Sequence, residues 1–289
     1  GQGALQFQAA ELIPIPIDDA AGQLPIPKRI RAIVTKALAA NPAERYQNVT
    51  ALADDVIVGI LPLTLFKTPL FGRFATSVPF VNYGGIVADT SEAASALLSA
   101  GVDEAKAAKA SYLELRHTQR MFPHLPVQTH KVEMVLRLEG TVDDQWRALD
   151  RKIRNQVRKA EKSNLVVRAG GLELLDAFHD VLVRNMRDLG TPVHGRAFFE
   201  RMLTAFPAET RLFGVFLDGR PVAASFVICH RQGAEVPWAS SLRAYNHLCP
   251  NVLLYWAMLQ FSIERGLTMF DFGRSTPFEG TYQFKKQWG

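Results

Sequence analysis

The chain has 289 residues, a length that corresponds to roughly two compact domains. Its hydrophobic fraction of 48% and mean hydropathy of +0.01 exclude a disordered or fibrous protein, and without a run of about 18 apolar residues we expect no membrane span and a cytoplasmic location. The formal net charge is +5, and the two cysteines, Cys229 and Cys249, exclude a disulfide framework and a thiolate zinc site.

The first 55 residues differ in character from the rest of the chain. Extended, proline-punctuated segments are predicted at 13–17 and 24–27, followed by helices over 28–40 and 43–56. The stretches 27–38 and 41–47 resemble the end of the C-terminal lobe of serine/threonine protein kinases, which implies a structural role for Arg45. No glycine-rich phosphate loop or His-Arg-Asp loop occurs, and Asp271-Phe272-Gly273 follows this segment instead of preceding it. A kinase is therefore excluded.

From residue 56 onward, short strands alternate with helices. Period-two alternation predicts strands over 112–117 and 131–138, and apolar residues three and four apart predict one amphipathic helix over 146–162. The later predicted elements, in chain order, are a strand (165–168), two helices (172–189 and 196–206), a hairpin turning at Asp218-Gly219 (211–217 and 221–228), a strand (235–242), a buried helix ended by Gly266 (250–265) and a strand (269–273).

One segment carries the whole excess of positive charge. Residues 151–162 contain six basic residues and one acid, whereas the rest of the chain has 27 of each. A solvated helix face is one interpretation. Because like charges at helical spacing repel each other, we also expect an anionic ligand: a nucleotide diphosphate, a tRNA backbone or a lipid headgroup. Arg154, Arg158 and Lys159 are the predicted phosphate ligands.

Several separated motifs add a family resemblance. The predicted order of elements resembles the GNAT acyltransferase core, which has three antiparallel strands, then a buried helix and then another strand. The basic helix, the C-terminal segments 271–276 and 280–289, and the upstream segments 61–63, 71–73 and 77–85 resemble FemAB-like proteins that accompany exosortase sorting systems. The resemblance covers about residues 56–289.

This resemblance implies a fold and an activity. The implied fold is α/β (α+β), with tandem GNAT-like units of which the first is incomplete. The implied activity is transfer of an acyl or aminoacyl group to an amine in cell-envelope or exopolysaccharide biosynthesis. We expect a kinase-tail-like helical segment (1–55), a partial first GNAT-like unit (56–139) and a second unit truncated at its C-terminus (140–289). An inactive fused fragment or an adaptor is the alternative that this arrangement leaves open.

The same resemblance points to site residues. Lys285 falls on the lysine of the family's Phe-Lys motif, where a cation would stabilise a developing oxyanion; the alternative is a surface lysine on a terminal strand. Arg274 and Ser275 follow a strand end, which favours either an anion contact or a capped turn. Asn82 and Tyr83 lie in a turn that is a second candidate for contact with substrate.

The start of the predicted helix 250–265 bears on which acyl donor the chain uses. Enzymes of this fold that use acetyl-CoA bind its pyrophosphate at the start of the helix that corresponds to 250–265, on a glycine-rich turn. This chain has Cys249-Pro250 there, without a glycine and with one N–H fewer, so acetyl-CoA is the less favoured alternative. We expect no bound cofactor, an aminoacyl-tRNA or acyl thioester as donor, and an anionic or nucleotide-linked substrate. The seven histidines show no metal-ligand spacing.

Overall fold

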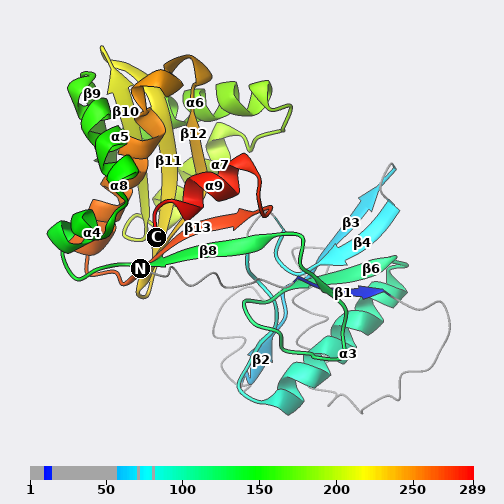
Figure 1. The fold of residues 1–289 in the computed structure, drawn as a ribbon. Helices are drawn as coiled ribbons and strands as arrows, with labels where there is room; N and C mark the ends of the chain where they lie inside the picture. The colour runs from blue at the N-terminus through cyan, green and yellow to red at the C-terminus, as the bar shows by residue number, and fades with distance from the viewer. Residues whose placement is uncertain (1–9, 15–56, 70–71, 80–81) are drawn as a thin grey trace. The chain divides into compact units, whose positions relative to one another are not determined.

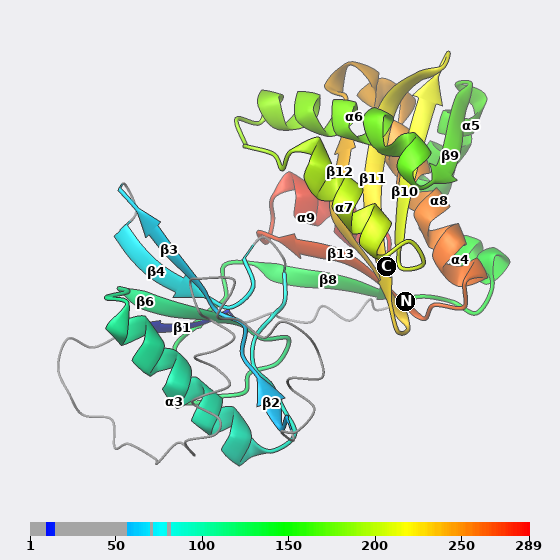
Figure 2. The same cartoon turned by 180° about the vertical axis from the view of Figure 1, so that it is seen from behind.

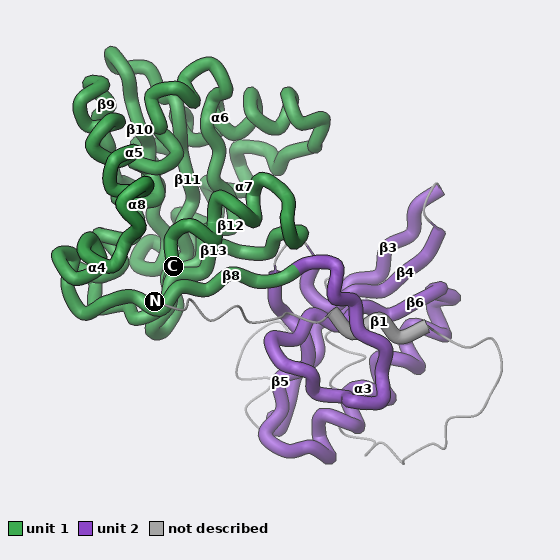
Figure 3. Tube along the Cα trace, viewed as in Figure 1, with its two compact units in different colours: residues 1–6, 132–289 green, residues 7–131 purple. Residues whose placement is uncertain are grey.

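The computed structural model describes residues 10–14, 57–69, 72–79 and 82–289 (Figure 1). The chain divides between Lys131 and Val132 into two compact units, of residues 7–131 and of residues 132–289 with 1–6, which we call the N-terminal and C-terminal units (Figure 3). The expected boundary stood at 139/140. The predicted helices 28–40 and 43–56, and with them the kinase-like motif, lie outside the described residues.

The N-terminal unit is a mixed sheet with one long helix, α3 (Ser91–Ala107). Five strands pair in the order β3-β4-β6-β1-β7, and β2 pairs with β5. Their bounds are β1 (Ala10–Pro14), β2 (Gly59–Ile60), β3 (Thr64–Thr68), β4 (Gly72–Thr76), β5 (Val87–Ala88), β6 (Tyr112–Arg116) and β7 (Val127–Gln128). The strand predicted at 112–117 is confirmed as β6, and its alternate residues Leu113 and Leu115 are fully buried against α3 and its neighbours.

The C-terminal unit is built on a six-stranded sheet in the order β8-β13-β12-β11-β10-β9 (Figures 1 and 2). The strands are β8 (Val132–Arg137), β9 (Leu165–Gly170), β10 (Thr210–Leu217), β11 (Arg220–His230), β12 (Gly233–Ser241) and β13 (Met269–Ser275). All neighbours are antiparallel except β12 and β13, whose parallel pairing requires a crossover. The crossover consists of the short helix η3 (Arg243–Leu248) and α8 (Pro250–Glu264).

Local sequence signals account for the ends of several of these elements. Asp218 and Gly219 both have positive φ, of 48° and 78°, as a two-residue hairpin turn between right-twisted strands requires. Gly266, at φ 77°, ends α8, and its N–H donates to the Ile263 carbonyl. The predicted hairpin and the predicted end of the buried helix are therefore confirmed.

The helix predicted over 146–162 is two helices. α4 (Val142–Ala148) ends at Leu149, whose ψ of 144° is extended, and α5 (Arg151–Lys162) begins two residues later, after Asp150. The Asp150 carboxylate caps α5 by accepting the Lys152 N–H at 2.7 Å. The periodic pattern runs through the break because Trp146 and Leu149 pack against the same core as α5.

Helices cover both faces of this sheet (Figures 1 and 2). On one face, α5, α8 and the C-terminal helix α9 (Gly280–Lys286) share a core with the sheet, which explains why α8 is apolar nearly all round. On the other face, the short helix η2 (Leu172–Leu174), α6 (Leu175–Asp188) and α7 (Arg196–Ala205) pack over β10, β11 and β12 around Phe178, Phe199 and Phe226.

Candidate active site

An irregularity in β13 organises the polar residues of the C-terminal unit. The register between β13 and β8 shifts between Asp271 and Arg274, and Gly273 has a φ of 72°, which a residue with a side chain adopts only with strain. The Asp271 carboxylate accepts the Gly273 N–H at 2.6 Å and so stabilises the irregular turn. Bulges of this kind occur frequently beside active sites, because they redirect side chains and expose backbone groups.

Lys285 lies against this bulge. Its Nζ donates hydrogen bonds to the carbonyls of Gly273, at 3.0 Å, and Arg274, at 3.1 Å. The residue is in α9 and not on a terminal strand as expected. Phe284 and Trp288, four residues apart, both contact the Tyr255 ring of α8, as a helical spacing allows. Burial raises the pKa of Asp271, and the charge of the Lys285 ammonium offsets part of that rise.

Two carboxyl groups meet beside this bulge. Glu133 of β8 is only 3% exposed and lies on the same face of the sheet as Asp271, to which its side chain is hydrogen bonded. Burial and the neighbouring charge of Asp271 raise the pKa of Glu133 to about 9, and burial also raises the pKa of Asp271. The pair therefore keeps a proton at neutral pH. Such shared-proton pairs are typical of sites that accept or donate protons.

Two further charges flank the pair. Glu235 of β12 is the register partner of Asp271, and its negative charge contributes to the raised pKa of Glu133. Arg274 is the register partner of Glu133, and its positive charge acts in the opposite direction. Ser275, also predicted as an anion contact, is buried, and its hydroxyl has no hydrogen-bond partner among the described residues.

Sequence reasoning did not single out Glu133, Asp271 or Glu235. Strand alternation places Glu133 on the side of β8 away from Met134 and Leu136, which is usually the solvent side. Only the insertion of β13 beside β8 brings Asp271 against it. A usable signal was present in Asp271, a carboxylate between two phenylalanines of its strand, Phe270 and Phe272.

The predicted anion ligands on α5 have other contacts. The Arg154 guanidinium donates to the carbonyls of Arg147, at 3.0 Å, and Trp146, at 3.4 Å, and so caps the end of α4. Arg158 is exposed and lies over the Trp146 ring, with 5.4 Å between its Cζ and the ring centroid. Lys159 is exposed to solvent.

The predicted cationic residues do not converge. α5 packs against α8 and β9, whereas Lys285 is bonded to β13. Four strand spacings separate β13 from β9 in the sheet order, about 19 Å at the usual separation of neighbouring strands. The structure thus brings Lys285 and Arg274 together but leaves Arg154, Arg158 and Lys159 at the other end of the sheet.

The predicted residues Asn82 and Tyr83 belong to the N-terminal unit. They precede Gly84 and Gly85, whose N–H groups both donate to the Arg116 carbonyl, at 3.0 and 3.1 Å. This is the turn that the sequence indicated, and a contact with substrate stays a prediction.

The start of α8 has the features that counted against acetyl-CoA. Cys249 occupies the cap position with a φ of 60°, and Pro250 is the first helical residue. The N–H groups of Val252 and Leu253 turn back to the Cys249 carbonyl, at 3.2 and 3.3 Å. The choice of donor stays a prediction.

The described residues contain neither a cluster of metal-ligating side chains nor a membrane-spanning helix. Within them, no three histidine, cysteine or acidic side chains are grouped as a metal site would require. Nor does any helix in that part of the chain combine the length and apolarity needed to cross a bilayer.

Part of the C-terminal unit matches a known protein family model. Residues 147–286 match the family model for the acetyltransferase (GNAT) domain, a range that includes Asp271, Arg274 and Lys285. No curated protein matches the sequence.

Solved structures show the same fold. The chain is similar to the crystal structure of FemX, with 16% identity and a TM-score of 0.57 over 81% of this chain and 82% of that one. It is also similar to the C-terminal domain of a protein described as a lysylphosphatidylglycerol synthetase from Agrobacterium fabrum, with 11% identity and a TM-score of 0.51 over 78% and 76% of the two chains. The predicted α/β GNAT-like fold is confirmed. The C-terminal unit has the GNAT-type fold.

Proposed function

We propose that this protein transfers an acyl or aminoacyl group from an activated donor to an amine, at the β13 bulge. The observation that carries the proposal is that, within a GNAT-type domain, the Lys285 ammonium and the Asp271 carboxylate both bond to the irregular turn of β13, where the charge of Lys285 acts on Asp271. The amine nitrogen forms a bond to the carbonyl carbon of the donor, the bond from that carbon to the leaving group breaks, and the amine loses one proton.

The residues at the bulge have distinct proposed roles. Asp271, which is half-buried, accepts the proton of the amine directly or through Glu133. Lys285 contributes positive charge where the oxyanion of the tetrahedral intermediate develops, a contribution typically worth about 3 kcal/mol for one well-placed donor. Arg274, beside Glu133, is the proposed contact for an anionic group of the substrate.

We further propose an aminoacyl-tRNA or an acyl thioester as donor, a cytoplasmic location, and a role in cell-envelope or exopolysaccharide biosynthesis. The supporting observations are the FemAB-like motifs, with their link to exosortase systems, and the similarity to FemX. The second similar structure is named for a lipid that carries lysine. Acetyl-CoA is the less favoured donor because Cys249 and Pro250 replace a glycine-rich turn at the start of α8.

The test is an acyl-transfer assay on the full chain with mixed aminoacyl-tRNAs, acyl thioesters and acetyl-CoA as donors and an amine library as acceptor. We expect Lys285→Met to lower kcat by about 100-fold or more. Lys286→Met is the matched control, since Lys286 is the exposed neighbour on the same helix, and it should retain full activity. Asp271→Asn should lower kcat and remove the acidic limb of the pH–rate profile, which is the fall in rate at low pH that protonation of the acceptor causes.

Circular dichroism of each variant separates loss of chemistry from loss of fold. Absence of transfer with every donor would overturn the proposed function. Equal losses of kcat in Lys285→Met and Lys286→Met would overturn the role of Lys285. Tight binding of coenzyme A, measured by calorimetry, would make acetyl-CoA the favoured donor.

A further inference from the structure

The outer side of α5 is a surface of positive charge. Its exposed cations, which we call the basic face, are Arg151, Lys152, Arg158, Lys159 and Lys162. The segment that contains them accounts for the whole net charge of +5 and for the high isoelectric point of about 9.3. Glu161 is the single acidic residue of the helix.

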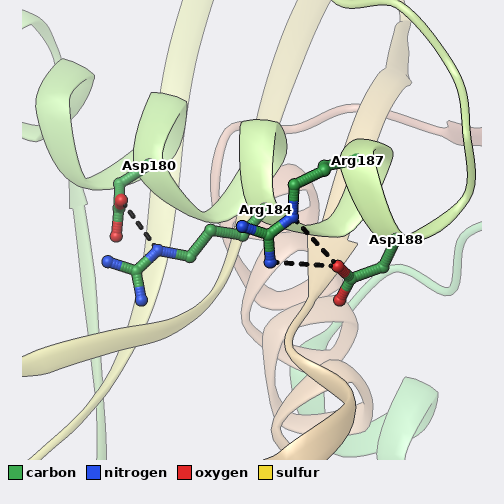
Figure 4. A network of polar contacts seen from close by, with 4 residues as sticks. All are labelled: Asp180, Arg184, Arg187 and Asp188. Atoms are coloured by element: carbon green, nitrogen blue, oxygen red, sulfur yellow. Dashed lines mark hydrogen bonds and ion pairs between the residues drawn. The ribbon is translucent and has the colours of Figure 1, made fainter.

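The basic face differs from the other charged helices of the same unit. On α6, Arg184 is paired with Asp180 at 2.9 Å and Arg187 with Asp188 at 3.1 Å (Figure 4). On α7, Arg196 is similarly paired with an aspartate and a glutamate. Within the described residues, no carboxylate lies within ion-pair distance of a cation of the basic face.

This charge arrangement is unfavourable to the fold itself. Arg151 and Lys152 occupy the first turn of α5, where the helix dipole favours negative charge. Arg151 and Arg158, and Lys152 and Lys159, stand two turns apart on the same side, so their charges repel each other at low ionic strength. A bound anion would remove both penalties.

The dimensions and composition of the face limit what that anion is. From Arg151 to Lys162 the helix advances about 16 Å, longer than a single phosphate or pyrophosphate group. A membrane-surface helix needs apolar side chains that enter the bilayer, but Ile153, Val157 and Ala160 are fully buried in the core. The helix contains no aromatic residue on which an unpaired base could stack. A row of phosphates on a polymer fits all three observations.

We propose that the basic face binds the phosphodiester backbone of a nucleic acid. The contact is electrostatic and independent of base sequence, since lysine and arginine side chains reach the phosphates and nothing on the helix reads a base. We choose RNA because an aminoacyl-tRNA is one donor of the proposed function. In this respect the inference rests on the proposed function. Arg158 is held over the Trp146 ring and presents its guanidinium from a fixed position.

The test is fluorescence anisotropy of a fluorescein-labelled RNA hairpin with the full chain, repeated over a series of KCl concentrations. The test variant replaces Arg151, Lys152, Lys159 and Lys162 by glutamine and leaves Arg158 in place to preserve packing on Trp146. The matched control replaces the same number of exposed arginines elsewhere by glutamine: Arg184, Arg187, Arg196 and Arg201 of α6 and α7.

We expect the test variant to reduce the slope of log Kobs against log salt by about one for each cation removed, and to weaken binding by about 100-fold near 0.1 M salt. The control variant should bind like the unmodified chain. Equal binding by the test variant and the unmodified chain would overturn the inference, as would displacement of the RNA by inorganic pyrophosphate at constant ionic strength.

A second arm addresses membranes. Flotation with phosphatidylglycerol–phosphatidylcholine vesicles should give no binding that depends on the four replaced residues; vesicle binding that is lost in the test variant while RNA binding persists would overturn the inference. Because both arms measure binding, their failure leaves the acyl-transfer proposal standing. Conversely, a chain that binds RNA but transfers no acyl group would refute the proposed function alone.

Discussion

Replacing Glu133 by glutamine should change how the stability of the protein depends on pH. Glu133 keeps its proton in the folded protein because it is buried beside Asp271. In the unfolded chain it loses that proton near its ordinary pKa of 4.5. The folded state therefore holds more protons than the unfolded state between pH 4.5 and about 9, so stability falls as the pH rises through this window. Glutamine does not titrate, and its amide can still donate to the Asp271 carboxylate.

The magnitude follows from the size of the pKa shift. For each pH unit inside the window, the free energy of unfolding of the unmodified protein falls by about 1.4 kcal/mol relative to a variant in which residue 133 does not titrate. Between about pH 5 and about pH 7, the unmodified protein should thus lose about 3 kcal/mol more than Glu133→Gln. Asp271 has a raised pKa as well, and both proteins share the part of the dependence that it contributes.

Urea denaturation followed by circular dichroism at a series of pH values measures this difference. Glu139→Gln is the matched control, because Glu139 follows the same strand but is exposed, and its curve should run parallel to that of the unmodified protein. If the curves of Glu133→Gln and the unmodified protein were also parallel from pH 5 to pH 8, the shared-proton pair would not exist and the proposed proton acceptor would fail with it.

Three further variants test the structure by the same denaturation measurement. Arg154→Met should cost about 1.5 kcal/mol by removing the cap on α4, while Lys152→Met on the exposed side of α5 should change little; equal effects would contradict the capping contact. Gly266→Ala should cost about 1 kcal/mol, since alanine is strained at a φ of 77°, whereas Gly140→Ala, in open space, should be nearly neutral. Leu254→Ala should cost about 3 kcal/mol because the side chain is fully buried, and a loss under about 1 kcal/mol would show that α8 is not in the core.

Elements with a strong local signal could be predicted from the sequence. The hairpin at Asp218-Gly219 depends on two adjacent residues that tolerate positive φ, and the end of α8 on Gly266. The strand β6 and the helix α8 follow from patterns of apolar residues that are contained within each element. The GNAT-like fold followed from the order of these elements together with the C-terminal motifs, and the family match to 147–286 agrees with it.

Predictions that needed information from outside one element were less successful. The division of 146–162 into α4 and α5 depends on how the Asp150 carboxylate caps a backbone N–H, which the apolar periodicity does not register. The helical conformation around Lys285 depends on packing against Tyr255, a residue in another helix. Arg154 was predicted to bind an anion, but in the structure its guanidinium donates to a carbonyl at the end of α4.

The sequence by itself determined where the charge lies, because the basic residues of α5 are contiguous, and it determined most helices and strands, because their periods are local. Only the tertiary structure decided which charged residues meet. Glu133, Asp271 and Glu235 are distant along the chain, and they become neighbours because hydrogen-bonded pairing sets β8, β13 and β12 side by side in one register. The burial that keeps a proton on this pair is likewise a property of the assembled sheet, since no carboxylate carries a raised pKa until the surrounding chain excludes water from it.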